Sequence, residues 1–136
     1  MGTVYLEVVT PERVVVSQQV ETVVAPGSIG EFGVLEGHVP FLTGILPGEL
    51  RYTTSGKTEY LAVTTGFAEV SDNKVSVLVD AAEKAQEIDV ERARKAMERA
   101  KERLSKDRGI PDIDFLRAEL ALKRAIARIK VAQKAM

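Results

Sequence analysis

Arginines near the end of the chain recur at helical spacing. The pattern Ile-Asp-x-x-Arg-Ala occurs at 88–93 and again at 113–118, and in each copy further arginines follow seven and then four residues later. These spacings place the arginines of each copy on one side of an α-helix. Guanidinium groups stay charged at physiological pH and bind phosphate or carboxylate groups through paired hydrogen bonds. The two rows therefore predict a surface that meets an anion.

A short link between two such helices favours an antiparallel hairpin. This pairing sets Arg92 opposite residue 127, so three guanidinium groups converge, those of Arg92, Arg124 and Arg128. Arg99 follows a turn or two further along. Like charges repel, and the helix dipole disfavours a cation in a first turn, so a bound phosphate or carboxylate would relieve both costs. The alternative is that nothing binds and acidic residues neutralise the cluster: Glu83, Glu87 and Asp89.

Helix signals surround both copies of the pattern. Asp89 and Asp114 are good N-cap residues, and an isoleucine precedes each. We expect helices at about 89–105 and from 114 to near the C-terminus, with a Gly- and Pro-containing link between them. Their apolar stripe is rich in alanine, which lets two helices approach closely but buries little area. The hairpin should therefore be only marginally stable alone.

The first part of the chain has the pattern of short β-strands. Valine-rich segments with turn residues between them predict an antiparallel sandwich or barrel that ends near Asp80. The turns Ser55-Gly56 and Asp72-Asn73 predict two hairpins. The expected strands are 4–9, 13–17, 20–25, 49–54, 57–63, 67–71 and 74–79. The fold class is thus β plus α, with a β-sandwich domain at 1–87 and a helical hairpin domain at 88–136.

Charge divides along the same boundary. Residues 1–87 carry 5 Lys+Arg and 12 Asp+Glu, a net charge of −7, whereas residues 88–136 carry 14 and 8, a net charge of +6. This asymmetry indicates either a basic tail that binds a partner or two halves that attract each other. Nucleic acid is not the expected partner, because acidic residues interrupt the basic tail and no aromatic residues are interleaved with it.

Catalysis by this chain alone is not expected. The sequence has one histidine and no cysteine, and no Gly-Lys-Ser/Thr follows its glycine-rich segment 30–40. That segment is typical of a tight corner in a sandwich, where glycines supply positive φ angles. A single histidine, His38, rarely makes a metal site, so no metal site is predicted.

Several segments, in this order, resemble the epsilon subunit of bacterial rotary ATP synthases over essentially the whole chain. Each motif is weakly specific alone, but the combination is highly specific. The segments that carry the resemblance are Val8-Val9-Thr10-Pro11, the glycine-rich segment 30–40 with Gly-His-x-Pro, Thr65-Gly66-Phe67-Ala68-Glu69-Val70, Ala81-Ala82-Glu83, Ile88-Asp89-Val90-Glu91-Arg92-Ala93, and 114–125.

The resemblance implies a non-catalytic rotor subunit of the proton-translocating synthase. Its sandwich would lie against the gamma subunit and the membrane-embedded ring of c subunits, with Glu31, Gly33 and His38 as candidate contacts. The protein would then be peripheral to the inner (plasma) membrane, on its cytoplasmic side, and held there only through the complex. A mobile hairpin would inhibit ATP hydrolysis by extending along gamma among the alpha and beta subunits.

Some bacterial members of this family bind ATP through the Ile-Asp-x-x-Arg-Ala motif when the hairpin is folded. The resemblance therefore implies ATP as a regulatory ligand, with no cofactor required. Two other readings remain: a freestanding adaptor whose basic hairpin binds an acidic protein, and a small enzyme. The link at 108–111 looks longer than is usual in the family, which would shift the register of the helices. The candidate ATP-binding residues are Glu83, Ile88, Asp89, Arg92, Ala93, Arg99, Arg124 and Arg128.

Overall fold

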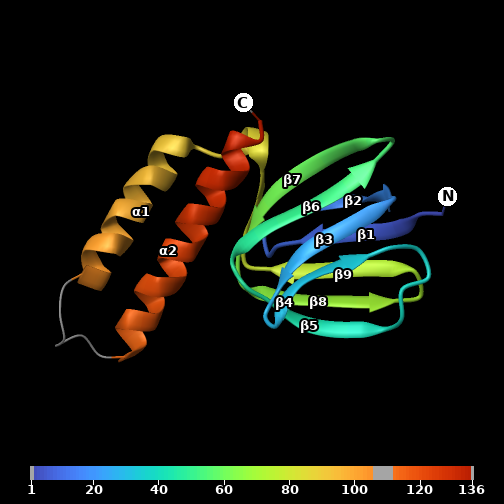
Figure 1. Ribbon diagram of the computed structural model, residues 1–136, viewed down its shortest axis with the longest axis horizontal. Helices are drawn as coiled ribbons and strands as arrows, with labels where there is room; N and C mark the ends of the chain where they lie inside the picture. The colour runs from blue at the N-terminus through green and yellow to red at the C-terminus, as the bar shows by residue number, and fades with distance from the viewer. Residues whose placement is uncertain (1, 106–111, 136) are drawn as a thin grey trace.

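A β-sandwich is followed by two packed helices in the computed structural model, which describes residues 2–105 and 112–135 (Figure 1). Those residues form ten strands, one 3-10 helix (η1, Ala85–Glu87) and two α-helices, α1 (Val90–Ser105) and α2 (Asp112–Gln133). The strands are β1 (Val4–Val9), β2 (Val14–Val20), β3 (Thr22–Gly27), β4 (Gly30–Val34), β5 (Phe41–Ile45), β6 (Gly48–Thr54), β7 (Lys57–Val63), β8 (Gly66–Ser71), β9 (Lys74–Val79) and β10 (Ala82–Lys84).

The strands form one continuous network that folds back on itself. Its order is β10-β7-β6-β3-β5-β8-β9-β1-β2, and β4 pairs with the other side of β3. A single residue pair, Gly27 with Ile45, joins the two halves of this order. The strand pairs of the described residues are antiparallel except that of β1 with β9, which is parallel. The fold class predicted from the sequence, a sandwich followed by a helical hairpin, is confirmed.

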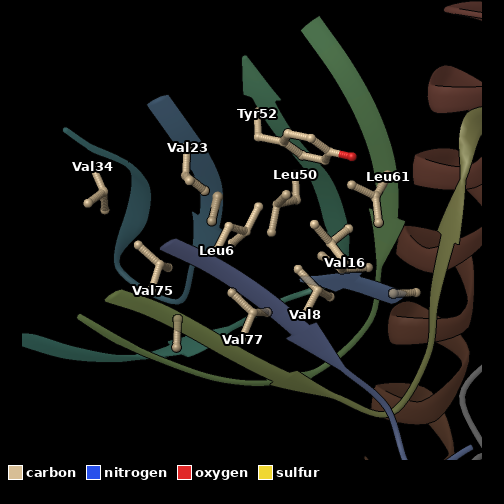
Figure 2. Close-up of a cluster of buried hydrophobic side chains, with 14 of the residues drawn as sticks. Leu6, Val8, Val16, Val23, Val34, Leu50, Tyr52, Leu61, Val75 and Val77 are labelled. Atoms are coloured by element: carbon tan, nitrogen blue, oxygen red, sulfur yellow. The ribbon is translucent and has the colours of Figure 1, made fainter. Parts of the chain in front are cut away.

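The core lies between the two layers of strands and consists mostly of valine and leucine (Figure 2). Val4, Leu6 and Val8 alternate along β1 and are fully buried, as expected when one face of a strand packs inward. Leu50 and Leu61 enter the same core from β6 and β7. Every residue of this core belongs to positions 4–82, so the helices do not contribute to it.

Both predicted hairpin turns are present. Ser55 and Gly56 have φ angles of 52° and 75°, and Asp72 and Asn73 have φ angles of 50° and 60°. Two successive positive φ angles are the signature of a type I′ turn, whose twist matches that of the flanking strands. β6 with β7 and β8 with β9 are accordingly paired antiparallel across these turns.

The predicted strand limits were wrong at several places. The glycine-rich corner begins with a strand, β4, which pairs with β3, and β5 was not predicted. β2 and β3 lie further along the chain than expected, at Val14–Val20 and Thr22–Gly27. The sheet also continues past Asp80, because β10 pairs with β7. Short strands such as β4, β5 and β10 depend on partners distant in sequence, and local alternation does not reveal them.

The two helices pack through small residues. Ala93 and Ala100 of α1 and Ala118 and Ala125 of α2 are buried, as the alanine stripe predicted. Asp89 caps α1, since its Oδ1 accepts a hydrogen bond from the backbone N–H of Arg92 at 3.1 Å. α2 begins two residues earlier than predicted. The link and the side chain of Ile113 lie outside the described residues, so the expected effect of the link on register stays a prediction.

α2 lies between α1 and the sandwich and carries most of the contact with it (Figure 1). Val131 and Ala132 near its end are buried against Ala62, Ala85 and Ile88. The Lys134 Nζ adds a cation–π contact, 5.2 Å from the centre of the Tyr60 ring. Among the described residues, neither helix is long and apolar enough to cross a membrane. The apolar part of the attachment is thus a small cluster near one end of α2.

Candidate functional site

An arginine-lined cleft lies where the two helices meet the end of the sandwich. We call it the arginine cleft; its volume is about 620 Å³. Alanines through which the helices pack line it together with arginines from both helices. It is lined by Thr64, Ala81, Glu83, Ala96, Arg99, Ala100, Arg103, Arg117, Ala118, Ala121, Arg124, Ala125 and Arg128.

The arginine cleft has an unbalanced positive charge. Five arginines and one glutamate line it, a formal charge of +4. Within residues 2–105 and 112–135, Arg99, Arg103 and Arg124 make no ion pair, and Arg117 reaches only Asp114, at 3.8 Å. Guanidinium groups cannot relieve mutual repulsion by losing a proton. The arrangement therefore suits a ligand with several negative charges, such as a polyphosphate.

Glu83 is the acidic residue of the arginine cleft and joins the sandwich to α2. Its two carboxylate oxygens accept hydrogen bonds from Arg128, at 2.6 Å from Nε and 3.3 Å from Nη2. Both side chains are only partly exposed, 32% and 22% respectively. Of the three acidic residues proposed to neutralise the cluster, Glu83 does so for one arginine. Asp89 instead caps α1, and Glu87 pairs with Arg13 at 3.0 Å.

The predicted ATP-binding residues divide into two groups. Those that line the arginine cleft are Glu83, Arg99, Arg124 and Arg128; those that do not are Ile88, Asp89, Arg92 and Ala93. Ile88 and Ala93 are buried in packing contacts. Arg92 is exposed and one turn nearer the start of α1 than Ala96, beyond the residues that line the cleft. Arg92 thus does not line this cleft with Arg124 and Arg128, and its role as an ATP contact stays a prediction.

Arg103 and Arg117 line the arginine cleft but were not among the predicted site residues. The signal was present in the sequence, because both belong to the arginine rows of the repeat. An antiparallel hairpin brings the end of the first row opposite the start of the second, which places these two residues across from each other. The convergence expected from the repeat concerned the opposite end of the hairpin, at Arg92.

The candidate contact residues of the sandwich lie on and beside β4. Glu31 and Gly33 are alternate, exposed residues of this strand, and Glu31 pairs with Arg51 at 3.2 Å. The hydrogen bond from Arg51 to Glu31 is the main reason that the pKa of Arg51 is raised. His38 follows in the next loop, with Nδ1 2.7 Å from the carbonyl oxygen of Val39 and its ring edge-on to Phe41. No group of acidic or histidine residues in the described parts of the chain could hold a metal ion.

An exposed apolar row crosses one face of the sandwich and was missed by the sequence analysis. Phe67, Leu78, Val9 and Val14 are successive cross-strand partners on β8, β9, β1 and β2. Phe67 is 64% exposed, Leu78 56% and Val14 57%. Adjacent large apolar side chains left in solvent usually mark an interaction surface. The signal was the run Val77-Leu78-Val79, in which apolar residues occupy both faces of one strand.

Glu87 should make stability sensitive to acid. Hydrogen bonds from Arg13 and from the backbone N–H of Lys84 lower its pKa below the ordinary value of 4.5. A lowered folded-state pKa means that Glu87 contributes stability at neutral pH, and that this contribution is lost as the pH falls through the folded-state pKa. Urea unfolding should thus find the parent more stable than Glu87→Gln at neutral pH by well under about 1 kcal/mol, because the pair is half exposed. Near pH 3 the difference should shrink; an equal difference at both pH values would contradict this assignment.

Comparison with known proteins places the whole chain in one family. Residues 3–85 match the β-sandwich domain of the ATP synthase Delta/Epsilon chain, and residues 86–133 match its long alpha-helix domain. The ATP synthase epsilon chain of Nitratidesulfovibrio vulgaris is 51% identical over 129 residues, 95% of each chain. That of Desulfitobacterium hafniense is 49% identical over 132 residues, 97% of this chain and 98% of the relative.

Solved structures agree with this placement. A chain of the Euglena gracilis mitochondrial ATP synthase, solved as OSCP/F1/c-ring, superposes with a TM-score of 0.81 at 25% identity and covers 98% of this chain and 82% of that one. A chain from the Tetrahymena thermophila synthase, with a TM-score of 0.57 and 16% identity, supports the fold alone. The resemblance found in the sequence is confirmed, and the matched relatives are subunits of a larger enzyme. The chain belongs to the ATP synthase delta/epsilon chain family.

Proposed function

We propose that this chain is a non-catalytic rotor subunit of a proton-translocating ATP synthase, which couples the catalytic head to the c-ring. The exposed apolar row of Phe67, Leu78 and Val14 suits permanent contact with another subunit, for which gamma is the candidate. The surface around Glu31, Gly33 and His38 is the candidate contact with the polar loops of the c-ring. Through these contacts the protein would be peripheral to the inner (plasma) membrane, on its cytoplasmic side.

The hairpin is the proposed regulatory element. Extended along gamma, its basic helices would lie among the alpha and beta subunits, meet acidic segments of beta and inhibit ATP hydrolysis. Two features support a movable hairpin: α2 is attached to the sandwich by a small apolar cluster and the partly exposed Glu83–Arg128 pair, and its partner helix is held through alanines. A conformational switch requires a small free-energy difference between its states, which such limited contacts provide.

ATP is the proposed ligand of the folded hairpin, and the observation that carries this proposal is the unpaired arginines of the arginine cleft. Arg99 and Arg124 come from different helices and line the same cleft. A polyphosphate bound between them would bridge the helices, offset their repulsion and add contacts that exist only in the folded state. A ligand that binds one state more tightly shifts the equilibrium toward it, so ATP would oppose inhibition.

Affinity capture tests the proposed place in the synthase. The immobilised chain should retain gamma and beta subunits from a bacterial membrane extract, whereas Phe67→Glu should lose gamma, because it puts a charge in place of the most exposed aromatic residue of the apolar row. Lys57→Glu is the control, since Lys57 is an exposed residue at the start of β7, away from that row. Retention of an unrelated acidic protein in place of gamma and beta would favour the freestanding adaptor.

A further inference from the structure

The segment that joins the sandwich to the hairpin is held by an ion pair in addition to the pairing of β10 with β7. Glu87 ends η1, and its carboxylate accepts hydrogen bonds from Arg13 Nη1 at 3.2 Å and Nη2 at 3.0 Å. Nη2 of Arg13 also lies 3.5 Å from the carbonyl oxygen of Ala82, and the backbone N–H of Lys84 donates to Glu87 at 2.9 Å. One arginine thus holds both ends of the short stretch from β10 to η1.

Arg13 is itself held in place by the sandwich. It ends the turn between β1 and β2, where Thr10 N–H donates to the Arg13 carbonyl oxygen at 2.9 Å. Thr10 is 7% exposed, and its hydroxyl is 3.3 Å from both the N–H and the carbonyl oxygen of Arg13. The hydrogen bonds of this turn therefore hold the backbone of Arg13. Its side chain then positions the carboxylate of Glu87.

The contacts of the chain pass from the sandwich to the hairpin immediately after Glu87. Ile88 packs against Val131 and Ala132 of α2, and Asp89 caps α1, so both residues belong to the hairpin by their contacts. Residues 82–84 and Glu87 are fixed to the sandwich, since β10 pairs with β7 and Glu87 pairs with Arg13, while Ala85 between them packs in the same cluster as Ile88. The two sets of contacts meet at the bond between Glu87 and Ile88.

We infer that the Arg13–Glu87 ion pair is a pin that sets the pivot of the hairpin and limits how often the hairpin leaves the sandwich. With the pin intact, the hairpin turns as one body about Glu87–Ile88. Without it, η1 can detach as well while β10 stays paired with β7, so the free linker lengthens and the undocked state gains conformational freedom. This inference rests on the hairpin mobility of the proposed function.

Distances between paired spin labels test the pin in the full chain. The sequence has no cysteine, so Lys57→Cys on the sandwich and Lys101→Cys on α1 give two unique labels on exposed residues. Arg13→Gln and Glu87→Gln should each raise the long-distance, undocked fraction by about two- to fivefold, the range for a half-exposed ion pair. The charge-swapped double variant R13E/E87R should bring the fraction back toward that of the parent.

Arg94→Gln is the matched control, because it removes an exposed arginine–glutamate pair within α1 without touching the pivot. It should leave the distances unchanged. Labels at Lys101→Cys and Lys123→Cys, both within the hairpin, should keep one distance in every variant. Two populations in the parent with no response to Arg13→Gln, or an equal response to Arg94→Gln, would overturn the pin alone. A single short distance in the parent and all variants would contradict the mobile hairpin and the pin together.

Discussion

Alanine in place of Arg124 is expected to weaken ATP binding by about 1.5–3 kcal/mol, roughly ten- to a hundredfold in Kd, which is the usual loss for one charged hydrogen bond. Arg124 is half-buried in the arginine cleft, makes no ion pair among the described residues, and is therefore free to bind a phosphate. Equilibrium dialysis with labelled ATP would measure the affinity. Arg99→Ala, from the facing helix, should lose a similar amount.

Lys123→Ala is the control for this loss. Lys123 is the neighbouring residue and carries the same charge, but it lines a different hollow on the other side of α2, beside Pro47 and Glu49. If Lys123→Ala weakened ATP binding as much as Arg124→Ala, the effect would reflect overall charge and the arginine cleft would lose its assignment. A large loss for Arg92→Ala would mean that the helices shift on binding, because Arg92 does not line the cleft.

Removal of residues 88–136 is expected to abolish inhibition of ATP hydrolysis and leave the sandwich folded. The main core uses residues 4–82 only, so truncation exposes little more than the small surface under the end of α2. Circular dichroism of the shortened chain should show β structure with a cooperative thermal transition. A synthase assembled with it should hydrolyse ATP faster than one assembled with the full chain.

Two results would contradict this expectation in different ways. An unfolded spectrum would mean that the sandwich depends on the hairpin, against the division into domains at 87 and 88. A folded sandwich with an unchanged hydrolysis rate would mean that the hairpin is not the inhibitory element. The full chain with Lys101→Ala, an exposed substitution on α1, controls for changes in assembly.

The sequence was most informative where local chemistry decides the structure. Positive φ angles at Ser55-Gly56 and Asp72-Asn73, the Asp89 cap and the alanine contact between the helices each follow from residues close together in the chain. Strands β4 and β10 were missed because they exist through pairing with β3 and β7, and little in their own residues requires them.

Only part of the candidate site could be predicted, because local spacing decides some of its residues and distant contacts decide the others. Helical spacing identifies which arginines share a side of a helix, and it correctly grouped Arg99 with Arg103 and Arg124 with Arg128. Helical spacing does not show which part of the hairpin faces the sandwich residues that complete the cleft. That depends on where α2 docks on the sandwich. That contact left Arg92 outside. The exposed row of Phe67 and Leu78 escaped notice because alternation alone does not tell which face of a sheet stays uncovered.

A calorimetric titration of the full chain with Mg-ATP, with ADP as the comparison, tests the central claim most directly. The unpaired arginines of the arginine cleft should bind ATP at micromolar to low-millimolar concentration and ADP much more weakly, because ADP carries one phosphate fewer for the same cations. Absence of heat with ATP, together with an unchanged thermal midpoint, would remove nucleotide binding. The arginines would then serve as the basic face that contacts the beta subunit.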